Sequence, residues 1–414
     1  MTESAGPRIM AMHEHLARFS DDDSGLTCTY LRPAHRATAA AIRDLMLSAN
    51  LETEIDAVGN VVGRWRCGKA GAKTLITGSH YDTVINGGKY DGRLGIVLPI
   101  ACAAHLRRQD ATLPFDLEIV AFAEEEGVRF KSTFLGSSAL AGNFDMQVLD
   151  HADADGISMR AAMREAGHDP AAIPTIARDP RTLAGYVEVH IEQGPVLLEA
   201  GRPLGVVTSI AGSVRMLMTI TGLAGHSGTV PMTLRRDAAA AAAEIVLLVE
   251  KRCSTSPGLV GTVGRLEVPG GAINVIPGRC ELSIDIRAGS DALRDGAVAD
   301  VLAEIERITA RRNVAIDVRR VLDAACAPCD AAMQRQIAAA ISRTTREAAP
   351  LHLPSGAGHD AMKMATITPV GMLFVRCGNG GISHHPDESL AADDAAVAAR
   401  AFTDFLLHFE PVKP

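Results

Sequence analysis

The sequence predicts an α/β fold in which helices flank a central, mostly parallel sheet and a ferredoxin-like α+β domain is inserted into the chain. Strands alternate with helices through the first half, which is typical of a parallel sheet. Residues 213–326 instead follow the order βαββαβ of a four-stranded antiparallel unit. The strand and helix alternation resumes at residue 327. A length of 414 residues also exceeds what one hydrophobic core usually supports, so we expect two domains.

The spacing of apolar residues predicts each element in turn. In the first half we expect helices over 35–49 and 92–108 and strands over 73–77, 115–123 and 186–192. In the insert we expect strands over 215–221, 259–268, 279–287 and 314–322, with helices over 234–252 and 291–312. A helix over 331–348, a strand over 368–375 and a helix over 391–408 complete the pattern. Residues 1–212 and 327–414 therefore form one discontinuous domain, and residues 213–326 form a second.

The composition argues against several classes of partner. A net charge of -8, a pI near 6.0 and an aromatic content of 4% indicate neither a basic nor a base-stacking surface, so we expect no nucleic acid and no anionic membrane. The N-terminal segment has no apolar leader, and the longest apolar run is interrupted by His105. Eight scattered cysteines are typical of reduced thiols in a cytoplasm. Cys326 and Cys329 have the spacing of a zinc or redox pair, but no second pair accompanies them, so we expect no function there.

Polar side chains with metal-binding chemistry follow three of the predicted strands. His80, Glu125 with Glu126, and His190 each stand where a strand ends. Because ligands of α/β sheets bind at the carboxyl ends of the strands, we expect these side chains to share one site. Asp82, two residues after His80, can accept a hydrogen bond from the imidazole ring and fix its tautomer.

Each of these features also has a structural interpretation. Asp91 follows a glycine-rich turn and can either bridge two cations or cap a helix that begins at residue 92. A run of glutamates is more often a solvated loop, and a lone strand histidine such as His190 is more often structural than a ligand. Of the adjacent His384 and His385, at most one is expected to bind metal. Taken together, the mixed imidazole and carboxylate set suits zinc, manganese or cobalt.

Eight sequence blocks, in order, resemble the M20 metallohydrolases and, within them, the hydantoinase/carbamoylase amidases. The resemblance covers about residues 10–408. The blocks are GSHYDTVINGGKYDG at 78–92, EEEGVRF at 124–130, HIEQGP at 190–195, AGHSGTVPM at 224–232, NVIPG at 274–278, DIR at 285–287, SGAGHDA at 355–361 and ISHHPDE at 382–388. HIEQGP favours the amidases over the M20 peptidases, several of which have an acidic ligand at that position.

The resemblance implies a role for each residue of the first domain. Two divalent ions, zinc in the first place or manganese, cobalt or nickel, would be held with one carboxylate bridging them. Glu125 would act as the general base towards water and later as the acid, and Asp82 would orient His80. The bridging carboxylate would be Asp91. The implied metal ligands are His80, Asp91, Glu126, His190 and His384.

The resemblance also implies substrate contacts and a homodimer formed through the inserted domain, which would act as a lid. His226 would stabilise the oxyanion, reaching over from the partner subunit, and Arg287 would clamp a substrate carboxylate. Gln193, Asn274 and His359 would also contact substrate, with Asp360 as a supporting residue. The family often has asparagine in the slot of His385, so assigning His384 as the ligand rests on alignment alone. AGHSGTVPM departs from the commoner NHAG form, which leaves the shape of the oxyanion site open.

The expected function is hydrolysis of the ureido or carbamoyl C–N bond of an anionic small molecule. Allantoate and N-carbamoyl-L-amino acids are the candidate substrates, with a slight preference for allantoate. One alternative is an aminoacylase or dipeptidase that uses the same metals on another acyl group. A second is a non-catalytic binding protein on the same scaffold.

Overall fold

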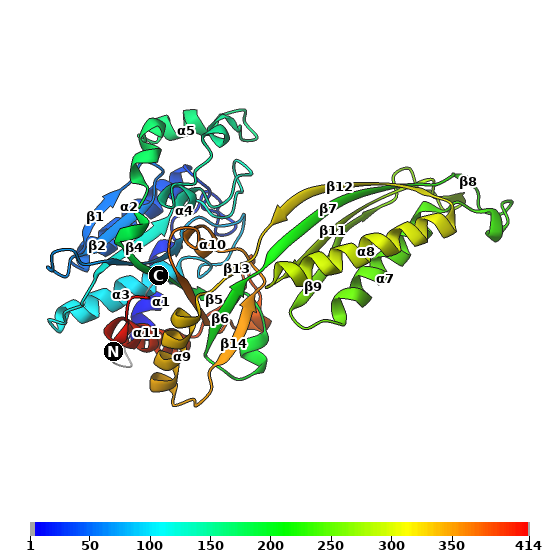
Figure 1. Ribbon diagram of the computed structural model, residues 1–414. Coiled ribbons are helices and arrows are strands. Elements are labelled where there is room, and N and C mark those ends of the chain that lie inside the picture. Colours follow the sequence, from blue (N-terminus) through cyan, green and yellow to red (C-terminus); the bar gives the residue numbers. More distant parts are fainter. Residues whose placement is uncertain (1–4, 413–414) are drawn as a thin grey trace. The chain divides into compact units, whose positions relative to one another are not determined.

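The computed structural model describes residues 5–412, which divide into two compact units (Figure 1). Unit 1 comprises the residues up to Thr208, 329–353 and those from Gly358 onward. Unit 2 comprises 209–328 and 354–357. The boundaries expected from the sequence, at 212/213 and 326/327, differ from these by a few residues. Nothing in the sequence indicated that the short segment 354–357 belongs to unit 2.

Unit 1 is built from short strands and helices around one sheet. The strands of this sheet are β1 (Glu52–Ile55), β2 (Val61–Trp65), β3 (Thr74–His80), β4 (Asp116–Phe122), β5 (Leu183–Ile191), β6 (Leu204–Ile210), β13 (Ala327–Pro328), β14 (Leu351–Ser355) and β15 (Val370–Val375). Of these, β13 and the last two residues of β6 and of β14 belong to unit 2. Its helices are α1 (Ala5–Leu16), α2 (Pro33–Ser48), α3 (Leu94–Arg108), α4 (Leu135–Leu140), α5 (Met159–Glu165), α6 (Val196–Glu199), α9 (Ala331–Thr345), α10 (Ala361–Met364) and α11 (Ala392–His408). Four 3-10 turns complete it: η1 (Met146–Asp150), η2 (Pro170–Ile176), η3 (Pro180–Thr182) and η5 (Asn379–Gly381).

The sheet has the order β1-β2-β4-β3-β5-β15-β6-β13, and β14 also pairs with β6. Its four central strands, β4, β3, β5 and β15, run parallel, whereas β1, β2, β6 and β13 are joined in antiparallel pairs. The predicted parallel sheet is therefore confirmed at the centre. In the register of these strands His80 pairs with Phe122, and His190 pairs with Phe374. The carboxyl ends of β3, β4, β5 and β15 consequently lie along one edge.

Helices cover the sheet and enclose the core of unit 1. Helix α3 contacts β3, β4 and β5, and it also packs on α1, α2 and α11. Helices α4 and α10 contact each other and pack on the same central strands. Helix α3 is buried over almost its whole length, from Leu94 to Leu106. This explains why its sequence is apolar around the helix and lacks a single hydrophobic stripe.

Unit 2 has the βαββαβ order expected for a ferredoxin-like domain. Its elements are β7 (Gly212–Thr221), β8 (Gly225–His226), the 3-10 turn η4 (Met232–Leu234), α7 (Ala238–Ser254), β9 (Leu259–Glu267), β10 (Val275–Ile276), β11 (Arg279–Ala288), α8 (Asp291–Arg312) and β12 (Ala315–Ala324). The antiparallel sheet has the order β12-β7-β11-β9, and α7 and α8 contact each other and the sheet. A separate core of apolar residues fills the space between this sheet and the two helices. None of the helices among residues 5–412 is long and apolar enough to cross a membrane.

Several element ends differ from the sequence-based expectation for local reasons. The helix expected from residue 234 begins at Ala238, because Asp237 caps it by accepting hydrogen bonds from the backbone N–H groups of Ala239 and Ala240, both at 3.0 Å. The helix expected to end at residue 348 ends at Thr345, and Arg346 adopts a left-handed conformation. Helices α1, α4 and α5, strands β1 and β2, and strands β6 and β14 were not expected from the sequence.

Candidate metal centre

The aligned ends of the central strands bring the predicted residues of unit 1 together. His80 is the last residue of β3, and the glutamates at 124–126 follow β4 directly. His190 lies one residue before the end of β5. Asp91 lies in the turn just before α3, whose N-cap is Arg93. The alternative interpretation of Asp91 as the helix cap is therefore wrong.

The Asp91 carboxylate lies between two groups of side chains. Its Oδ1 is 3.3 Å from Nε2 of His190 and 3.9 Å from Nε2 of His80. Its Oδ2 is 3.1 Å from Nε2 of His384, which in turn lies 3.4 Å from Oε1 of Glu126. Burial opposes ionisation of Asp91, but the hydrogen bond from His384 and the nearby imidazoles hold the pKa of this carboxyl well below its usual range.

Asp82 contacts both His80 and the glutamate segment. Its Oδ1 lies 3.3 Å from Nδ1 of His80. The backbone N–H groups of Glu125 and Glu126 donate to its two carboxylate oxygens at 3.1 and 3.2 Å. Burial alone would lower the pKa of His80, but the hydrogen bond to Asp82 and the charges of Glu125 and Asp91 raise it well above the usual value. Asp82 thus orients one imidazole and fixes the backbone of both glutamates.

His190 is oriented by its own strand. Its Nδ1 lies 2.8 Å from the carbonyl oxygen of Ile191, to which it can only donate. With the proton on Nδ1, Nε2 is an acceptor: it accepts the backbone N–H of Gly92 at 3.2 Å and lies 3.3 Å from Oδ1 of Asp91. Burial lowers the pKa of His190 to about 4. His359 packs edge to face on the His190 ring at a centroid distance of 4.4 Å, and burial lowers its pKa well below the usual value.

The two adjacent histidines at 384 and 385 point in different directions. His384 adopts a left-handed backbone conformation with φ of 55° and directs Nε2 at Asp91. The ring of His385 turns to Asp387 instead, with Nδ1 accepting the backbone N–H of that residue at 3.1 Å. The hydrogen bond to Asp91 raises the pKa of His384 to about 9. The geometry therefore favours His384 over His385 as the residue of the centre.

Of the three successive glutamates after β4, Glu124 and Glu125 are buried and Glu126 is partly buried. Burial is the main reason why the pKa of Glu126 is raised to about 7 and why the pKa values of Glu124 and Glu125 lie well above the usual value. Such carboxylates are costly in the absence of a compensating cation. Glu124 is partly satisfied by the backbone N–H of Gly127 at 2.6 Å.

These contacts meet the requirements of a site for divalent ions. Each group of three candidate ligands has its donor atoms within 4.8 Å of one another. Asp91 belongs to two groups, which is the arrangement that a bridging carboxylate requires, and the mixture of imidazole and carboxylate suits zinc and its neighbours. No cysteine joins any such group among residues 5–412, and Cys326 and Cys329 are free thiols. The four groups are His80/Asp91/His190, Asp91/Glu126/His384, His80/Glu125/Glu126 and Glu188/His190/His359.

Three further residues of unit 1 support the centre, and sequence reasoning assigned them no role. Glu188 is fully buried and accepts hydrogen bonds from Ser79, Tyr186 and the backbone of Ala361. Ser383 and Glu388 lie beside Asp91. The alternation of YVEVHIE could have indicated Glu188, because it places residues 188 and 190 on one face of β5. Gln193 was expected to contact substrate, and its amide nitrogen lies 3.0 Å from both oxygens of Asp91.

The predicted residues of unit 2 lie at opposite ends of its sheet. His226 is exposed in β8, and the carbonyl of Asn274 accepts the N–H of Ser227 at 3.0 Å, so these two segments lie together. Arg287 pairs with Ser213 at the start of β7, whereas His226 follows the other end of that strand at Thr221. From Ser213 to Thr221 the strand alone spans about 26 Å. His226 and Arg287 of one chain therefore cannot contact the same small molecule.

Arg287 borders a cavity of about 540 Å³ in unit 2. Its Nε and Nη2 donate to Asp285, and its Nη1 donates to the carbonyl of Gly356 at 2.9 Å. Arg215 donates to the same aspartate at 3.0 Å. One carboxylate thus compensates two guanidinium groups, which leaves a local excess of positive charge suited to an anion.

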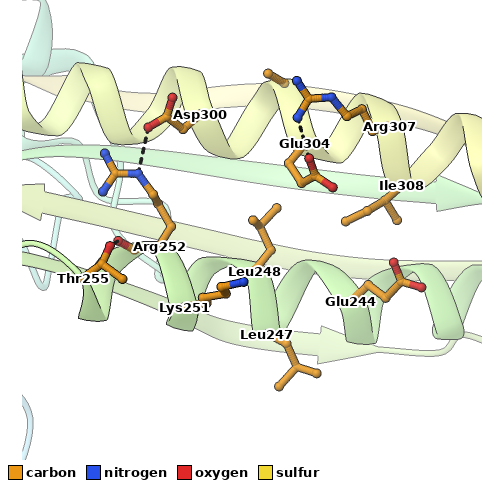
Figure 2. Close-up of a pocket in the computed structure, with 11 residues that line it drawn as sticks. Glu244, Leu247, Leu248, Lys251, Arg252, Thr255, Asp300, Glu304, Arg307 and Ile308 are labelled. Atoms are coloured by element: carbon orange, nitrogen blue, oxygen red, sulfur yellow. Dashed lines mark hydrogen bonds and ion pairs between the residues drawn. The ribbon is translucent and has the colours of Figure 1, made fainter.

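A second cavity, of about 670 Å³, lies between α7 and α8 and contains none of the predicted residues (Figure 2). Leu247, Leu248 and Ile308 give it an apolar floor and rim. Its charged residues are largely paired with one another, as Arg252 with Asp300 and Arg307 with Glu304. Nothing in this groove resembles the chemistry of the metal centre.

Comparison with known proteins agrees with this geometry. Residues 76–408 match peptidase family M20/M25/M40. The chain is 40% identical to allantoate deiminase 2 of Glycine max, with 94% of this chain and 87% of the relative covered, and 39% identical to N-carbamoyl-L-amino acid amidohydrolase of Geobacillus stearothermophilus, with 91% of each covered. A crystal structure of a hydantoinase/carbamoylase family amidase of Burkholderia multivorans aligns with a TM-score of 0.91 and 29% identity over 98% of both chains. The chain therefore belongs to peptidase family M20/M25/M40, among its hydantoinase/carbamoylase amidases, and is a hydrolase of non-peptide C–N bonds.

Proposed function

We propose that the protein is a dinuclear-metal amidohydrolase that cleaves the ureido or carbamoyl C–N bond of an anionic small molecule, with allantoate first and N-carbamoyl-L-amino acids second. The observation that carries the proposal is the position of Asp91. One of its oxygens faces His80 and His190, and the other faces His384 beside Glu126. The nearly equal identities to an allantoate deiminase and to an N-carbamoyl-L-amino acid amidohydrolase support both substrate classes.

In this proposal two divalent ions, zinc in the first place or else manganese, cobalt or nickel, are held with the Asp91 carboxylate between them. Bound there, such ions would lower the pKa of a water and polarise the substrate carbonyl. Support comes from four groups that converge on Asp91, each of a type that binds these metals: His80 and His190 are buried, whereas Glu126 is partly buried and His384 is half-exposed. The proposed ligands are His80, Asp91, Glu126, His190 and His384.

Glu125 acts as the general base in the proposed reaction. It takes a proton from the attacking water and later donates it to the leaving nitrogen. Water and a carbamoyl substrate together then give the amine, ammonia and carbon dioxide. Two features support this role. The carboxylate of Glu125 lies beside His80 and Glu126. Its pKa is raised well above the usual value, which suits a carboxyl group that must first accept a proton and then donate it.

Residues of both units act on the substrate in this proposal. Arg287 binds the substrate carboxylate with the N–H groups that Asp285 and Gly356 do not use. His226 stabilises the developing oxyanion, and Asn274, held beside it, contacts the substrate. Gln193 and His359 complete the contacts from unit 1. The excess positive charge around Asp285 supports selection of an anionic substrate.

We further propose a homodimer formed through unit 2, which also serves as the lid. The strand length between Arg287 and His226 supports this, because a small substrate can meet both residues only if they come from different chains. The exposed edge strand β9, with Val260 and Leu266 on its surface, offers apolar area for such contact. The eight free thiols support a cytoplasmic location.

The test is a substrate panel with the zinc-loaded protein and its Glu125→Gln variant. We expect turnover of allantoate or an N-carbamoyl-L-amino acid, measured as released ammonia, and a decrease in kcat of about 100- to 10,000-fold in the variant. The zinc content of the variant should equal that of the wild type, because Glu125 is not a proposed ligand. Rapid turnover of only N-acetyl amino acids or dipeptides would show that the substrate class is wrong. Unchanged kcat in the variant would show that the base is wrong.

A further inference from the structure

Glu388 is a buried carboxylate in the segment between η5 and α11, and only 3% of it is exposed. Its Oε1 accepts the backbone N–H of Tyr90 at 2.9 Å and that of Asp91 at 3.1 Å. Its Oε2 accepts the hydroxyl of Ser383 at 2.7 Å. One side chain therefore joins two segments that lie almost three hundred residues apart in the sequence, and each segment carries a proposed metal ligand.

The chain leaves space for this carboxylate at Gly88. A Cβ atom at this position would lie 2.1 Å from Cδ of Glu388 and 2.2 and 2.5 Å from its two oxygens. Gly88 has no left-handed backbone conformation that would itself require glycine. Glycine is therefore needed at residue 88 because Glu388 approaches so closely, and not because of the backbone conformation there.

The contacts of Glu388 fix the two residues on either side of the candidate centre. The bonds to Tyr90 and Asp91 hold the backbone from which the Asp91 carboxylate projects. Ser383, held through its hydroxyl, precedes His384 and lies 3.4 Å from Oδ2 of Asp91. Both oxygens of Glu388 are occupied by these donors, and Glu388 belongs to none of the groups that could ligate an ion.

We propose that Glu388 is a positioning residue that sets the Asp91 carboxylate and the His384 imidazole at the separation needed to hold a divalent ion. The inference rests on the proposed dinuclear centre and adds to it a residue that binds neither metal nor substrate. Residues that orient metal ligands commonly contribute about 10- to 100-fold to metal affinity.

The experiment measures the zinc affinity of the metal-free full-length protein by competition with a chromogenic chelator. We expect Glu388→Ala and Gly88→Ala each to lower the affinity by about 10- to 100-fold. In Gly88→Ala the carboxylate of Glu388 is still present, but the added methyl group displaces it. Glu388→Gln should stay closer to the wild type, because its amide oxygen can still accept the N–H groups of Tyr90 and Asp91.

The matched control is Asp330→Ala. Asp330 also accepts two backbone N–H groups in unit 1, at the start of α9, and contacts no proposed ligand. The Asp330→Ala variant should have a lower free energy of unfolding than the wild type when both are unfolded by denaturant in the presence of chelator. It should nevertheless bind zinc as the wild type does. Wild-type affinity in both Glu388→Ala and Gly88→Ala, or an equal loss in Asp330→Ala, would overturn the positioning role. If Glu388→Ala does not fold, Gly88→Ala and Glu388→Gln decide the question. A wild-type protein without zinc affinity would instead refute the proposed centre itself.

Discussion

His384 and His385 show how one backbone dihedral angle selects between two identical side chains. The left-handed conformation of His384 directs its ring to Asp91, while the ring of His385 lies against Asp387. For a residue other than glycine this conformation is uncommon, and the surrounding contacts must hold it in place. The hydrogen bond between His384 and Asp91 is one such contact.

The two histidines provide a matched pair of variants. His384→Asn should lower zinc affinity by more than about 100-fold, because it removes a proposed ligand. This loss exceeds the loss of about 10- to 100-fold that is usual for a residue that only orients a ligand. His385→Asn should bind zinc as the wild type does. Chelator competition on the metal-free proteins measures both. An equal loss in the two variants would contradict the assignment of His384.

The same two variants test whether His384 is protonated in the metal-free protein. Its hydrogen bond to Asp91 raises its pKa from 6.5 to about 9, so this proton stabilises the metal-free fold fully below pH 6.5, and the effect is lost as the pH rises through about 9. A ligating imidazole is neutral, so zinc affinity should fall as the pH falls below about 9. Because zinc would also displace the proton of His80 in both variants, calorimetry in buffers of different ionisation enthalpy should show that His384→Asn releases about one proton fewer at pH 8 than His385→Asn does. The same proton count in both variants would contradict it.

At the scale of elements, α3 sets the position of the strands that carry His80 and His190. It approaches the sheet most closely at Gly95, where a Cβ atom would lie 2.4 Å from the carbonyl oxygen of Val189 and 2.7 Å from the side chain of Ser79. These two residues directly precede His190 and His80. The packing of one helix therefore fixes two neighbouring strand ends, which no local sequence pattern reveals.

Gly95→Ala should lower the free energy of unfolding by about 1–3 kcal/mol, because the added methyl group must push α3 away from β3 and β5. The measurement is denaturant unfolding in chelator. The control is Gly296→Ala in α8, where a Cβ atom meets nothing within 4 Å. That variant should be neutral or more stable by up to about 1 kcal/mol, because alanine is the better helix former. Equal effects at both positions would show that α3 does not approach the sheet as closely as described.

At the scale of the whole molecule, the two units have separate cores and different tasks in the proposed function. Unit 1 carries every proposed metal ligand, and unit 2 carries His226, Asn274 and Arg287. The length of β7 separates His226 from Arg287 within a chain. The proposed symmetric dimer would overcome this separation, because each chain could lend its histidine to its partner.

This arrangement predicts complementation between two inactive chains. Glu125→Gln and His226→Ala should each be inactive alone. When the chains are mixed under conditions that exchange subunits, the hybrid dimer has one site with both Glu125 and the partner's His226. Activity should return to about a quarter of the wild-type level for random pairing in a twofold dimer. No recovery, with hybrid dimers verified by two affinity tags, would contradict the lending of His226.

Much of the centre could be predicted from the sequence, because residues of metal-binding types stand at the ends of the predicted strands. Parallel strands align their carboxyl ends, so His80, Glu125, Glu126 and His190 were expected in one place, and they lie together. The eight sequence blocks also indicated the M20 family and its amidase branch, which the comparisons confirm. The βαββαβ order of unit 2 was visible from apolar periodicity alone.

Only the tertiary structure decided which atoms face one another. The choice of His384 over His385, the Glu388 carboxylate beside Gly88 and the hydrogen bonds of the buried Glu188 to Ser79 and Ala361 all depend on contacts between segments far apart in the chain. The separation of His226 from Arg287 follows from strand register, which local patterns do not encode. The sequence by itself determined the fold class, the family and the chemistry of the ligands, since these follow from residue type and periodicity. The distances among the ligands were settled by packing, because it is the meeting of distant segments that fixes each side chain in one direction.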